Sequence, residues 1–254
     1  MATAISWTDE TWNPTSGCSH VSEGCRFCYA ERISLKFGWS KKPWTAPNAE
    51  ENVVLHPERL RKPYSWKTPS RVFVNSMSDL FHPQIPDSFI ADVFKVMVDT
   101  PQHTYQILTK RPERAAEWGG PWPKNIWQGT SVEDAKAMPR IDHLRRCGAQ
   151  TRFLSCEPLL GPLDGINLDG IHWVIVGGES GFHMQPQSPR WMKMAWARSI
   201  RDACVDQGTA YFFKQDAGMK TELRPWLVEE DGSKWKWHQY PGIFTPPERI
   251  LIAA

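Results

Sequence analysis

The chain has 254 residues, enough for one large domain or two small ones with a buried core. Its 30 basic and 28 acidic residues leave a net charge of +2, which neither requires nor excludes a polyanionic partner. No apolar run approaches the length of a membrane span, and the N-terminus lacks a secretion signal. We therefore expect a cytoplasmic protein with no membrane partner, in which clustered cysteines are metal or redox ligands rather than disulfides.

Short apolar strands alternate with helical stretches along most of the chain. The predicted strands cover residues 11–13, 71–75, 103–108, 126–129, 151–154, 171–176 and 210–213. The predicted helices cover residues 30–37, 86–100, 112–118, 133–146 and 191–207. Because this alternation builds right-handed βαβ units on a parallel sheet, we predict an α/β fold. A partial or full (β/α) TIM-type barrel over residues 1–218 accounts for the pattern better than an open sheet does.

Two segments fall outside this alternation. Residues 39–70 contain five prolines and are predicted to form an irregular Trp/Pro-rich insertion in the barrel. Residues 219–254 are rich in Trp, Pro and charged residues, and we expect a C-terminal extension that packs on the barrel. Cysteines that stand alone in the sequence are predicted to be buried as small hydrophobic residues. These are Cys147, Cys156 and Cys204.

A cysteine loop, which we define as residues 17–29, follows the first predicted strand. It holds Cys18, Cys25 and Cys28 in the spacing C-x6-C-x2-C, which is typical of metal ligands in a cytoplasmic protein. A structural zinc site normally has four protein ligands, and His20 could be the fourth one here. If the three cysteines are the only ligands, one position of the site stays open for another molecule.

Polar clusters follow the predicted strands, at the end where a barrel or an open α/β sheet places its active site. The residues of these clusters include Ser76, Ser78, Asp79, Lys110, Thr130, Ser131, Glu133, Glu157, Glu179 and Lys214. Their hydroxyl and carboxylate oxygens could accept hydrogen bonds from a ligand, and the lysines, together with Arg111 next to Lys110, could pair with a carboxylate or a phosphate. The same residues could instead cap helices, form tight turns or make structural salt bridges. The sequence leaves these alternatives open.

A cysteine loop after the first strand of a parallel β/α domain resembles the radical S-adenosylmethionine superfamily. Its second half, Cys25-Arg26-Phe27-Cys28, fits the C-x3-C-x-φ-C pattern of that superfamily, whereas the first gap holds six residues instead of three. Over about residues 5–218 the chain is also similar to a phage-associated family of three-Cys-motif proteins that are regarded as radical S-adenosylmethionine-like. The segments that carry this similarity are residues 7–9, 11–14, 17–29, 72–81, 108–112, 129–133, 155–159, 177–181 and 213–215.

The resemblance implies a radical S-adenosylmethionine enzyme of the lyase or transferase type with a β/α barrel. It implies that Cys18, Cys25 and Cys28 bind three irons of a [4Fe-4S] cluster and that S-adenosyl-L-methionine binds the fourth. One electron from the cluster would cleave S-adenosylmethionine to a 5′-deoxyadenosyl radical, which takes hydrogen from the substrate. An electron donor of the flavodoxin or ferredoxin type is implied as a partner.

The same resemblance gives expected roles to the other candidate residues. We expect Phe27 and Tyr29 to flank the adenine of the cofactor. The residues expected to hold its polar groups are Ser76, Ser78, Asp79, Thr130, Ser131 and Glu133. The residues expected to face the substrate and to act in catalysis are Lys110, Glu157, Glu179 and Lys214.

A basic and aromatic stretch suggests the class of substrate. Residues 59–71 hold five basic residues, two aromatics and no acid, and Arg190, Trp191, Lys193 and Arg198 form a second such group. Cations that follow phosphates and aromatics that stack on bases are typical of nucleic-acid binding. The alternative is a solvated face on which Lys and Arg stems cover Trp. We therefore expect an enzyme that modifies or repairs a nucleic-acid base or nucleotide, with a non-enzymatic zinc-binding nucleic-acid-binding protein as the alternative.

Overall fold

The computed structural model describes residues 3–180, 189–220, 222–243 and 245–251. The chain forms two compact units, one of Met1–Thr130 with Asp142–Thr151 and one of Ser131–Ile141 with Arg152–Ala254. The end of the similar segment 177–181 lies outside the described residues. No helix in the described part of the chain has both the length and the apolar character that a membrane span requires.

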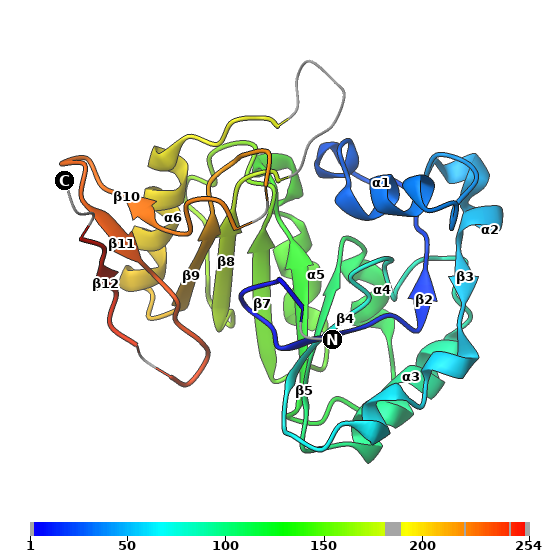
Figure 1. Ribbon diagram of the computed structural model, residues 1–254. Coiled ribbons are helices and arrows are strands. Elements are labelled where there is room, and N and C mark those ends of the chain that lie inside the picture. The colour runs from blue at the N-terminus through cyan, green and yellow to red at the C-terminus, as the bar shows by residue number, and fades with distance from the viewer. Residues whose placement is uncertain (1–2, 181–188, 221, 244, 252–254) are drawn as a thin grey trace. The chain divides into compact units, whose positions relative to one another are not determined.

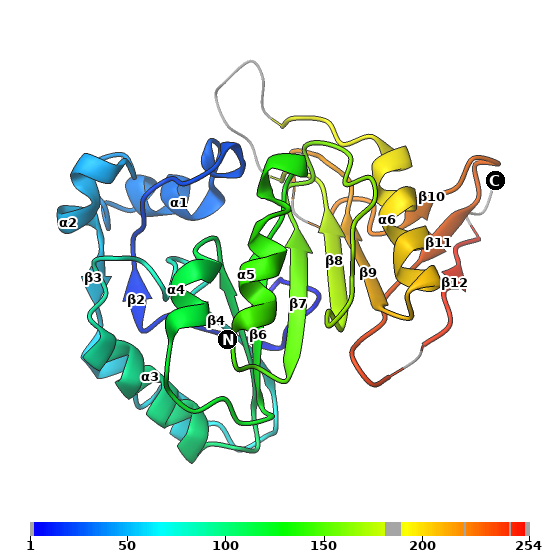
Figure 2. The ribbon, with the colours of Figure 1, turned by 180° about the vertical axis from the view of Figure 1, so that it is seen from behind.

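A parallel sheet lies at the centre of the first unit. Its strands pair in chain order and are β1 (Glu10–Trp12), β4 (Arg71–Val74), β5 (Thr104–Thr109) and β6 (Ile126–Ser131). The β-branched and aromatic residues of the Val72-Phe73-Val74 run favour an extended backbone, and all three are buried. The helices that connect these strands are α3 (Asp87–Asp99) and α4 (Pro112–Glu117), which Figure 2 shows beside β4 and β6.

The core of the first unit lies between the sheet and α3. The predicted apolar stripe of this helix is confirmed, because Phe89, Ile90, Val93 and Phe94 are all buried. They pack in one cluster with the buried Trp12 of β1 and with apolar residues of β4 and β5. This core holds β1 and β4 side by side, so the segments that follow the two strands begin at the same edge of the sheet.

Residues 39–70, for which an irregular insertion is predicted, contain only short elements. The regular elements of this segment are α2 (Ala49–Asn52), β3 (Val54–Leu55) and the 3-10 turns η2 (Ala46–Asn48), η3 (Pro57–Arg59) and η4 (Lys62–Ser65). The cysteine loop before it contains the turn η1 (Glu23–Cys25) and leads into α1 (Tyr29–Lys36). Strand β2 (Thr15–Ser16) pairs antiparallel with β3, which links the start of the cysteine loop to the insertion. Figure 1 shows β2, α1, α2 and β3 together on one side of the first unit, in blue to cyan.

The second unit contains another run of parallel strands. They pair in chain order and are β7 (Thr151–Cys156), β8 (Trp173–Gly177) and β9 (Ala210–Gln215). Helix α6 (Met194–Asp206) packs on β8 and β9 through Ala197, Ile200 and Cys204 (Figure 1). The expected helix over residues 133–146 is split at Pro139 into the turn η5 (Ala135–Ala137) and α5 (Arg140–Arg146). The prediction that Cys147, Cys156 and Cys204 are buried is confirmed.

The C-terminal segment forms a small antiparallel sheet on the second unit. Its strands are β10 (Leu227–Val228), β11 (Lys234–Lys236) and β12 (Glu248–Arg249). The Phe213 N–H of β9 donates to the Trp237 carbonyl at 2.8 Å, and Trp173 Nε1 of β8 donates to the Gln239 carbonyl at 2.8 Å. These bonds hold the C-terminal segment against β8 and β9.

The predicted α/β class is confirmed in both units. Parallel strands follow one another in chain order and are joined by helices, as in successive βαβ units. This order is compatible with the expected partial barrel.

The half-buried imidazole of His238 predicts a dependence of stability on pH. His238 stacks on Phe212 with ring centroids 4.1 Å apart, and burial, together with the nearby Lys236, lowers its pKa from 6.5 to about 4. Below pH 6.5 the unfolded chain takes up a proton here that the folded chain does not, so the free energy of unfolding should fall between pH 6.5 and pH 4. Urea denaturation across this range should show a shallower fall for His238→Phe, which keeps a ring but cannot titrate. An equally steep fall in the variant would contradict this assignment.

Candidate functional site

The cysteine loop is anchored to the segment that follows β4. The Gly17 N–H donates to the Met77 carbonyl at 3.0 Å, and Gly17 and Ser78 form an isolated parallel bridge. Farther along, the His20 N–H donates to the Trp44 carbonyl at 3.0 Å. The loop therefore starts at the carboxyl ends of β1 and β4, the edge of a parallel sheet where active sites are found.

The entry to this loop requires a glycine. Gly17 has a φ of +82°, and a Cβ at this position would lie 1.8 Å from the Asn52 carbonyl oxygen. The left-handed backbone and the close approach of a second backbone segment both exclude a side chain. Gly17 thus determines the path on which the chain enters the cysteine loop.

The thiols of Cys18, Cys25 and Cys28 are free, and each of the three residues is half-buried. Cys25 ends η1 and Cys28 directly precedes α1, so two thiols sit on local helical turns. Cys25 Sγ lies 3.9 Å from Ser22 Oγ, and Cys18 Sγ lies 3.5 Å from Arg111 Nη1. Within the described ranges, no three His, Cys, Asp or Glu side chains are grouped so that they could hold a metal ion. Three free thiols on one loop are the donor chemistry that an iron–sulfur cluster requires.

The electrostatic surroundings raise the pKa of two of these thiols, those of Cys18 and Cys28. Burial raises the pKa of the Cys18 thiol to about 12; the Asp79 carboxylate adds to the rise and the Arg111 guanidinium opposes it. Burial also raises the pKa of the Cys28 thiol, and the Lys110 ammonium opposes this rise. A metal that binds here must displace protons, and Arg111 and Lys110 supply positive charge that stabilises the thiolates.

Asp79 is buried and accepts four hydrogen bonds in the described part of the chain. Its Oδ1 accepts from Phe81 N at 3.0 Å and from Thr109 Oγ1 at 2.6 Å. Its Oδ2 accepts from Lys110 N at 3.1 Å and from Arg111 Nη1 at 2.9 Å. A carboxylate offers about four lone-pair sites, so these donors occupy them. Asp79 thus ties the end of β5 to the segment after β4, and its expected contact with a cofactor stays a prediction.

Arg111 links this carboxylate to the cysteine loop. Its Nη2 donates to the Ser19 carbonyl at 2.9 Å and to Ser19 Oγ at 3.1 Å, while Nη1 reaches both Asp79 and Cys18 Sγ. Ser19 Oγ also forms a hydrogen bond with His82 Nε2 at 2.9 Å. The sequence pattern predicted no role in the site for Ser19 or His82. The prediction that Arg111 can pair with a carboxylate is confirmed by its ion pair with Asp79.

Ser76 and Ser78, which are expected to bind the cofactor, lie beside the start of the loop. Ser76 Oγ donates to Asn13 Oδ1 at 3.2 Å, and Ser78 Oγ forms a 2.7 Å hydrogen bond with Thr15 Oγ1. Both hydroxyls therefore connect the segment after β4 to the segment after β1. The structure brings them close to the cysteine loop, and their contact with a cofactor stays a prediction.

The remaining candidates of the first unit differ in exposure. Tyr29 is exposed, and its hydroxyl donates to the Ser76 carbonyl at 2.7 Å. Phe27 is buried, so most of its ring packs inside the protein. Thr130 is also buried, and its Oγ1 donates to the Thr109 carbonyl at 2.9 Å. The ring of Tyr29 is thus more accessible to a ligand than the ring of Phe27.

Ser131 and Glu133 lie in the second unit, at its first turn. Glu133 is buried and pairs with Arg140, Nη1 to Oε2, at 2.8 Å. The same Arg140 nitrogen donates to the Ser131 carbonyl at 2.8 Å. Arg140 was not predicted as part of the site, and it gives Glu133 the partner that a buried carboxylate requires.

Glu157 and Lys214 form an ion pair at the ends of β7 and β9. Lys214 Nζ lies 3.0 Å from Glu157 Oε1, and Ser155 Oγ donates to Glu157 Oε2 at 3.2 Å. A Cβ on Gly177 of β8 would lie 2.7 Å from Glu157 Oε1, so this glycine makes room for the carboxylate. The salt bridge left open by the sequence is therefore present, and a catalytic role of either residue stays a prediction.

Glu179 is buried and pairs with Arg190. Arg190 Nη2 contacts Glu179 Oε1, and the Arg190 N–H donates to Glu179 Oε2 at 2.9 Å. The preceding Gly178 packs closely, since a Cβ there would lie 2.2 Å from the Ala217 amide nitrogen. The Gly-Gly-Glu run therefore packs closely against the segment after β9, and a guanidinium holds its carboxylate.

Three of the five basic side chains of residues 59–71, those of Arg59, Lys62 and Arg71, are engaged in local contacts. Lys62 Nζ lies 5.3 Å from the Trp66 ring centroid, and Arg71 pairs with Asp9 at 2.8 Å. These contacts support the alternative interpretation of this stretch, in which Lys and Arg stems cover the protein's own aromatic surface.

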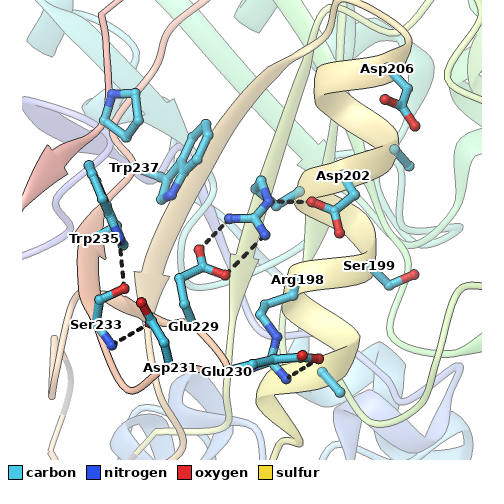
Figure 3. Close-up of a pocket in the computed structure, with 14 residues that line it drawn as sticks. Arg198, Ser199, Asp202, Asp206, Glu229, Glu230, Asp231, Ser233, Trp235 and Trp237 are labelled. Carbon is cyan, nitrogen blue, oxygen red and sulfur yellow. Dashed lines mark hydrogen bonds and ion pairs between the residues drawn. The ribbon is translucent and has the colours of Figure 1, made fainter.

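A depression of about 990 Å³ lies in the second unit between α6 and the strands β10 and β11 (Figure 3). Arg201 crosses it and pairs with Glu229 of the segment after β10 and with Asp202 of α6. Arg198 Nη2 lies 3.7 Å from Glu230 Oε1. The charged lining is thus a set of ion pairs that ties α6 to the C-terminal segment.

Comparison with known proteins identifies the family of the chain. No curated protein and no solved structure matches it. One family model matches residues 2–241, a range that includes the cysteine loop and the strand ends of both units. Because this match covers nearly the whole chain, the protein belongs to the family described as Protein of unknown function (DUF5131).

Proposed function

We propose that the protein is a radical S-adenosylmethionine enzyme in which Cys18, Cys25 and Cys28 hold a [4Fe-4S] cluster. The proposal is supported chiefly by the cysteine loop, which carries three free thiols at the carboxyl edge of a parallel sheet. Two cationic side chains, those of Arg111 and Lys110, act on these thiols electrostatically. When bound, the cluster would supply the single electron that cleaves the sulfonium of S-adenosylmethionine.

The residues around the thiols would prepare the site for this cofactor. Arg111 would orient Cys18 through its contacts with the Cys18 sulfur and the Ser19 carbonyl. Lys110 would stabilise the Cys28 thiolate. Ser76, Ser78, Thr130, Ser131 and Glu133 are the proposed contacts for the polar groups of S-adenosylmethionine, with Tyr29 and Phe27 near its adenine. Lys110, Glu157, Glu179 and Lys214 are proposed to face a nucleic-acid base or nucleotide as the substrate.

Anaerobic purification followed by iron and sulfide analysis tests the cluster. We expect brown wild-type protein with about four irons and four sulfides per chain after reconstitution. Replacing Cys18, Cys25 or Cys28 by Ala should remove most of both, because each variant loses one of three ligands. Two controls should keep full iron: Cys147→Ala removes a buried thiol outside the loop, and Val21→Ala shortens an exposed side chain of the loop but keeps its thiols.

Two results would count against the proposal. If Cys28→Ala contains as much iron as the wild-type protein, the cysteine loop is not the binding site of the cluster. Colourless protein that carries one zinc per chain would support the alternative, a non-enzymatic zinc-binding nucleic-acid-binding protein.

A further inference from the structure

Two large aromatic side chains are exposed directly after α1. Phe37 is 62% exposed and Trp39 is 60% exposed. Their rings stack on each other, with centroids 5.4 Å apart and planes at 26°. Burial of such a side chain stabilises a protein by roughly 1.5–3 kcal/mol, so rings that stay in water are a mark of an interaction surface.

The backbone that carries the two rings is held in place. The Trp39 N–H donates to the Ser34 carbonyl at 2.8 Å, and Ser34 Oγ forms a 2.9 Å hydrogen bond with Ser40 Oγ. Trp44 is buried, and its Nε1 donates to Ser40 Oγ at 2.9 Å. Gly38, with a φ of +70°, makes the turn between the two rings. The aromatic pair is therefore presented in one arrangement, which lowers the entropy that a ligand must overcome.

The surroundings of the pair are basic. Residues 32–49 contain four basic residues and no acid. Lys36 Nζ lies 5.7 Å from the Phe37 ring centroid, and Lys42 pairs with Glu51 at 2.6 Å. Arg32 and Lys41 are exposed, as is Lys36. Exposed rings that offer stacking surfaces, flanked by cations that neutralise phosphates, are the two parts of a single-strand binding site.

We propose that Phe37 and Trp39, with Arg32, Lys36 and Lys41, form a platform that binds single-stranded polynucleotide. The proposal deepens the proposed function by naming the substrate class and rests on it only for the chemistry, since binding needs no cluster. Helix α1 is eight residues long and starts directly after Cys28, so it spans about 12 Å. A few nucleotides of single strand cover such a length, so a strand held on the platform could reach the cysteine loop.

Fluorescence anisotropy with metal-free protein tests the platform. The probes are a labelled oligothymidylate and a labelled oligouridylate of about 15 nucleotides, which separate DNA from RNA as the ligand. Trp39→Ala and Phe37→Ala should each raise the Kd by about 5- to 150-fold, because one base stacked on a ring contributes about 1–3 kcal/mol. The double variant Lys36→Gln/Lys41→Gln should reduce the slope of the logarithm of the binding constant against the logarithm of salt concentration by about 1.4. This is the change expected when two phosphate contacts to a single strand are lost.

Trp191→Ala tests the other basic and aromatic group, because Trp191 is 69% exposed. The control is Val205→Ala, which shortens an apolar side chain that is 59% exposed and lies outside both basic and aromatic groups. It should leave the Kd unchanged. The proposal is overturned if Trp191→Ala weakens binding while Trp39→Ala does not, if neither probe binds, or if the platform variants lose affinity only for anionic vesicles. If the protein binds the probes but carries no cluster, the platform is supported and the proposed radical chemistry is contradicted. If it carries a cluster but does not bind the probes, only the platform is contradicted.

Discussion

Replacing Arg111 with Met should lower the free energy of unfolding by about 3–5 kcal/mol, because it leaves a buried carboxylate without its counter-charge. Arg111 Nη1 lies 2.9 Å from Asp79 Oδ2, and the side chains of Arg111 and Asp79 are only 12% and 7% exposed. The guanidinium also holds the Ser19 carbonyl, so its loss should free the start of the cysteine loop. Urea denaturation measures the first effect, and the iron content of anaerobically prepared protein measures the second.

The ion pair between Arg71 and Asp9 provides the control for this experiment. It has similar geometry at 2.8 Å but is far more exposed, with side chains 32% and 46% accessible. Arg71→Met should therefore cost only about 0–1 kcal/mol. Arg111→Lys should lower the free energy of unfolding by an amount between those of Arg111→Met and Arg71→Met. The lysine ammonium keeps the charge, but it lacks the two nitrogens with which the guanidinium binds Asp79 and Ser19 together. Equal losses for Arg111→Met and Arg71→Met would contradict the account of the buried pair.

Replacing Gly17 with Ala is the second change with a large expected effect. A left-handed backbone costs Ala about 1–2 kcal/mol, and the new Cβ must also displace the Asn52 carbonyl oxygen from 1.8 Å. We expect a total loss of about 3 kcal/mol or more in the free energy of unfolding, the strain of the close contact being added to the backbone cost. Because Gly17 directly precedes Cys18, iron binding should fall as well.

A Gly38→Ala variant separates the cost of the left-handed backbone from the cost of the close contact. Gly38 has a φ of +70°, but a Cβ at this position would meet nothing within 4 Å. Gly38→Ala should show only the backbone cost of about 1–2 kcal/mol and keep its iron. If the two glycine variants lose the same stability and the same iron, the close approach of Asn52 does not shape the loop.

The meeting of the segments after β4 and β5 could be predicted from the sequence, whereas the hydrogen-bonded pairs between them could not. Apolar strands followed by polar residues predict that the segments after β4 and β5 meet, and Asp79 indeed contacts Lys110 N and Arg111. Which of two adjacent cations pairs with Asp79 depends on side-chain direction, which a linear pattern does not contain. For the same reason the pairing of Glu133 with Arg140 was not predicted.

The basic and aromatic pattern of the sequence pointed to residues 59–71 and to the group around Trp191, and did not include the exposed pair Phe37 and Trp39. Residues 59–71 have the charge and the rings of a nucleic-acid site, yet Lys62 lies over Trp66 and Arg71 pairs with Asp9. Phe37 and Trp39 follow the short helix α1, and their exposure could not be predicted from the sequence pattern. The hydrogen bonds of Ser34, Ser40 and Trp44 that hold the backbone around the two rings cannot be seen in a linear pattern.

The most direct test of the proposed chemistry is the cleavage of S-adenosylmethionine by reconstituted, reduced protein under anaerobic conditions. If Cys18, Cys25 and Cys28 hold a [4Fe-4S] cluster, wild-type protein should release 5′-deoxyadenosine and methionine in equal amounts, and Cys28→Ala should release neither. Wild-type protein that carries a complete cluster but leaves S-adenosylmethionine intact would contradict the account, as would equal product formation by Cys28→Ala.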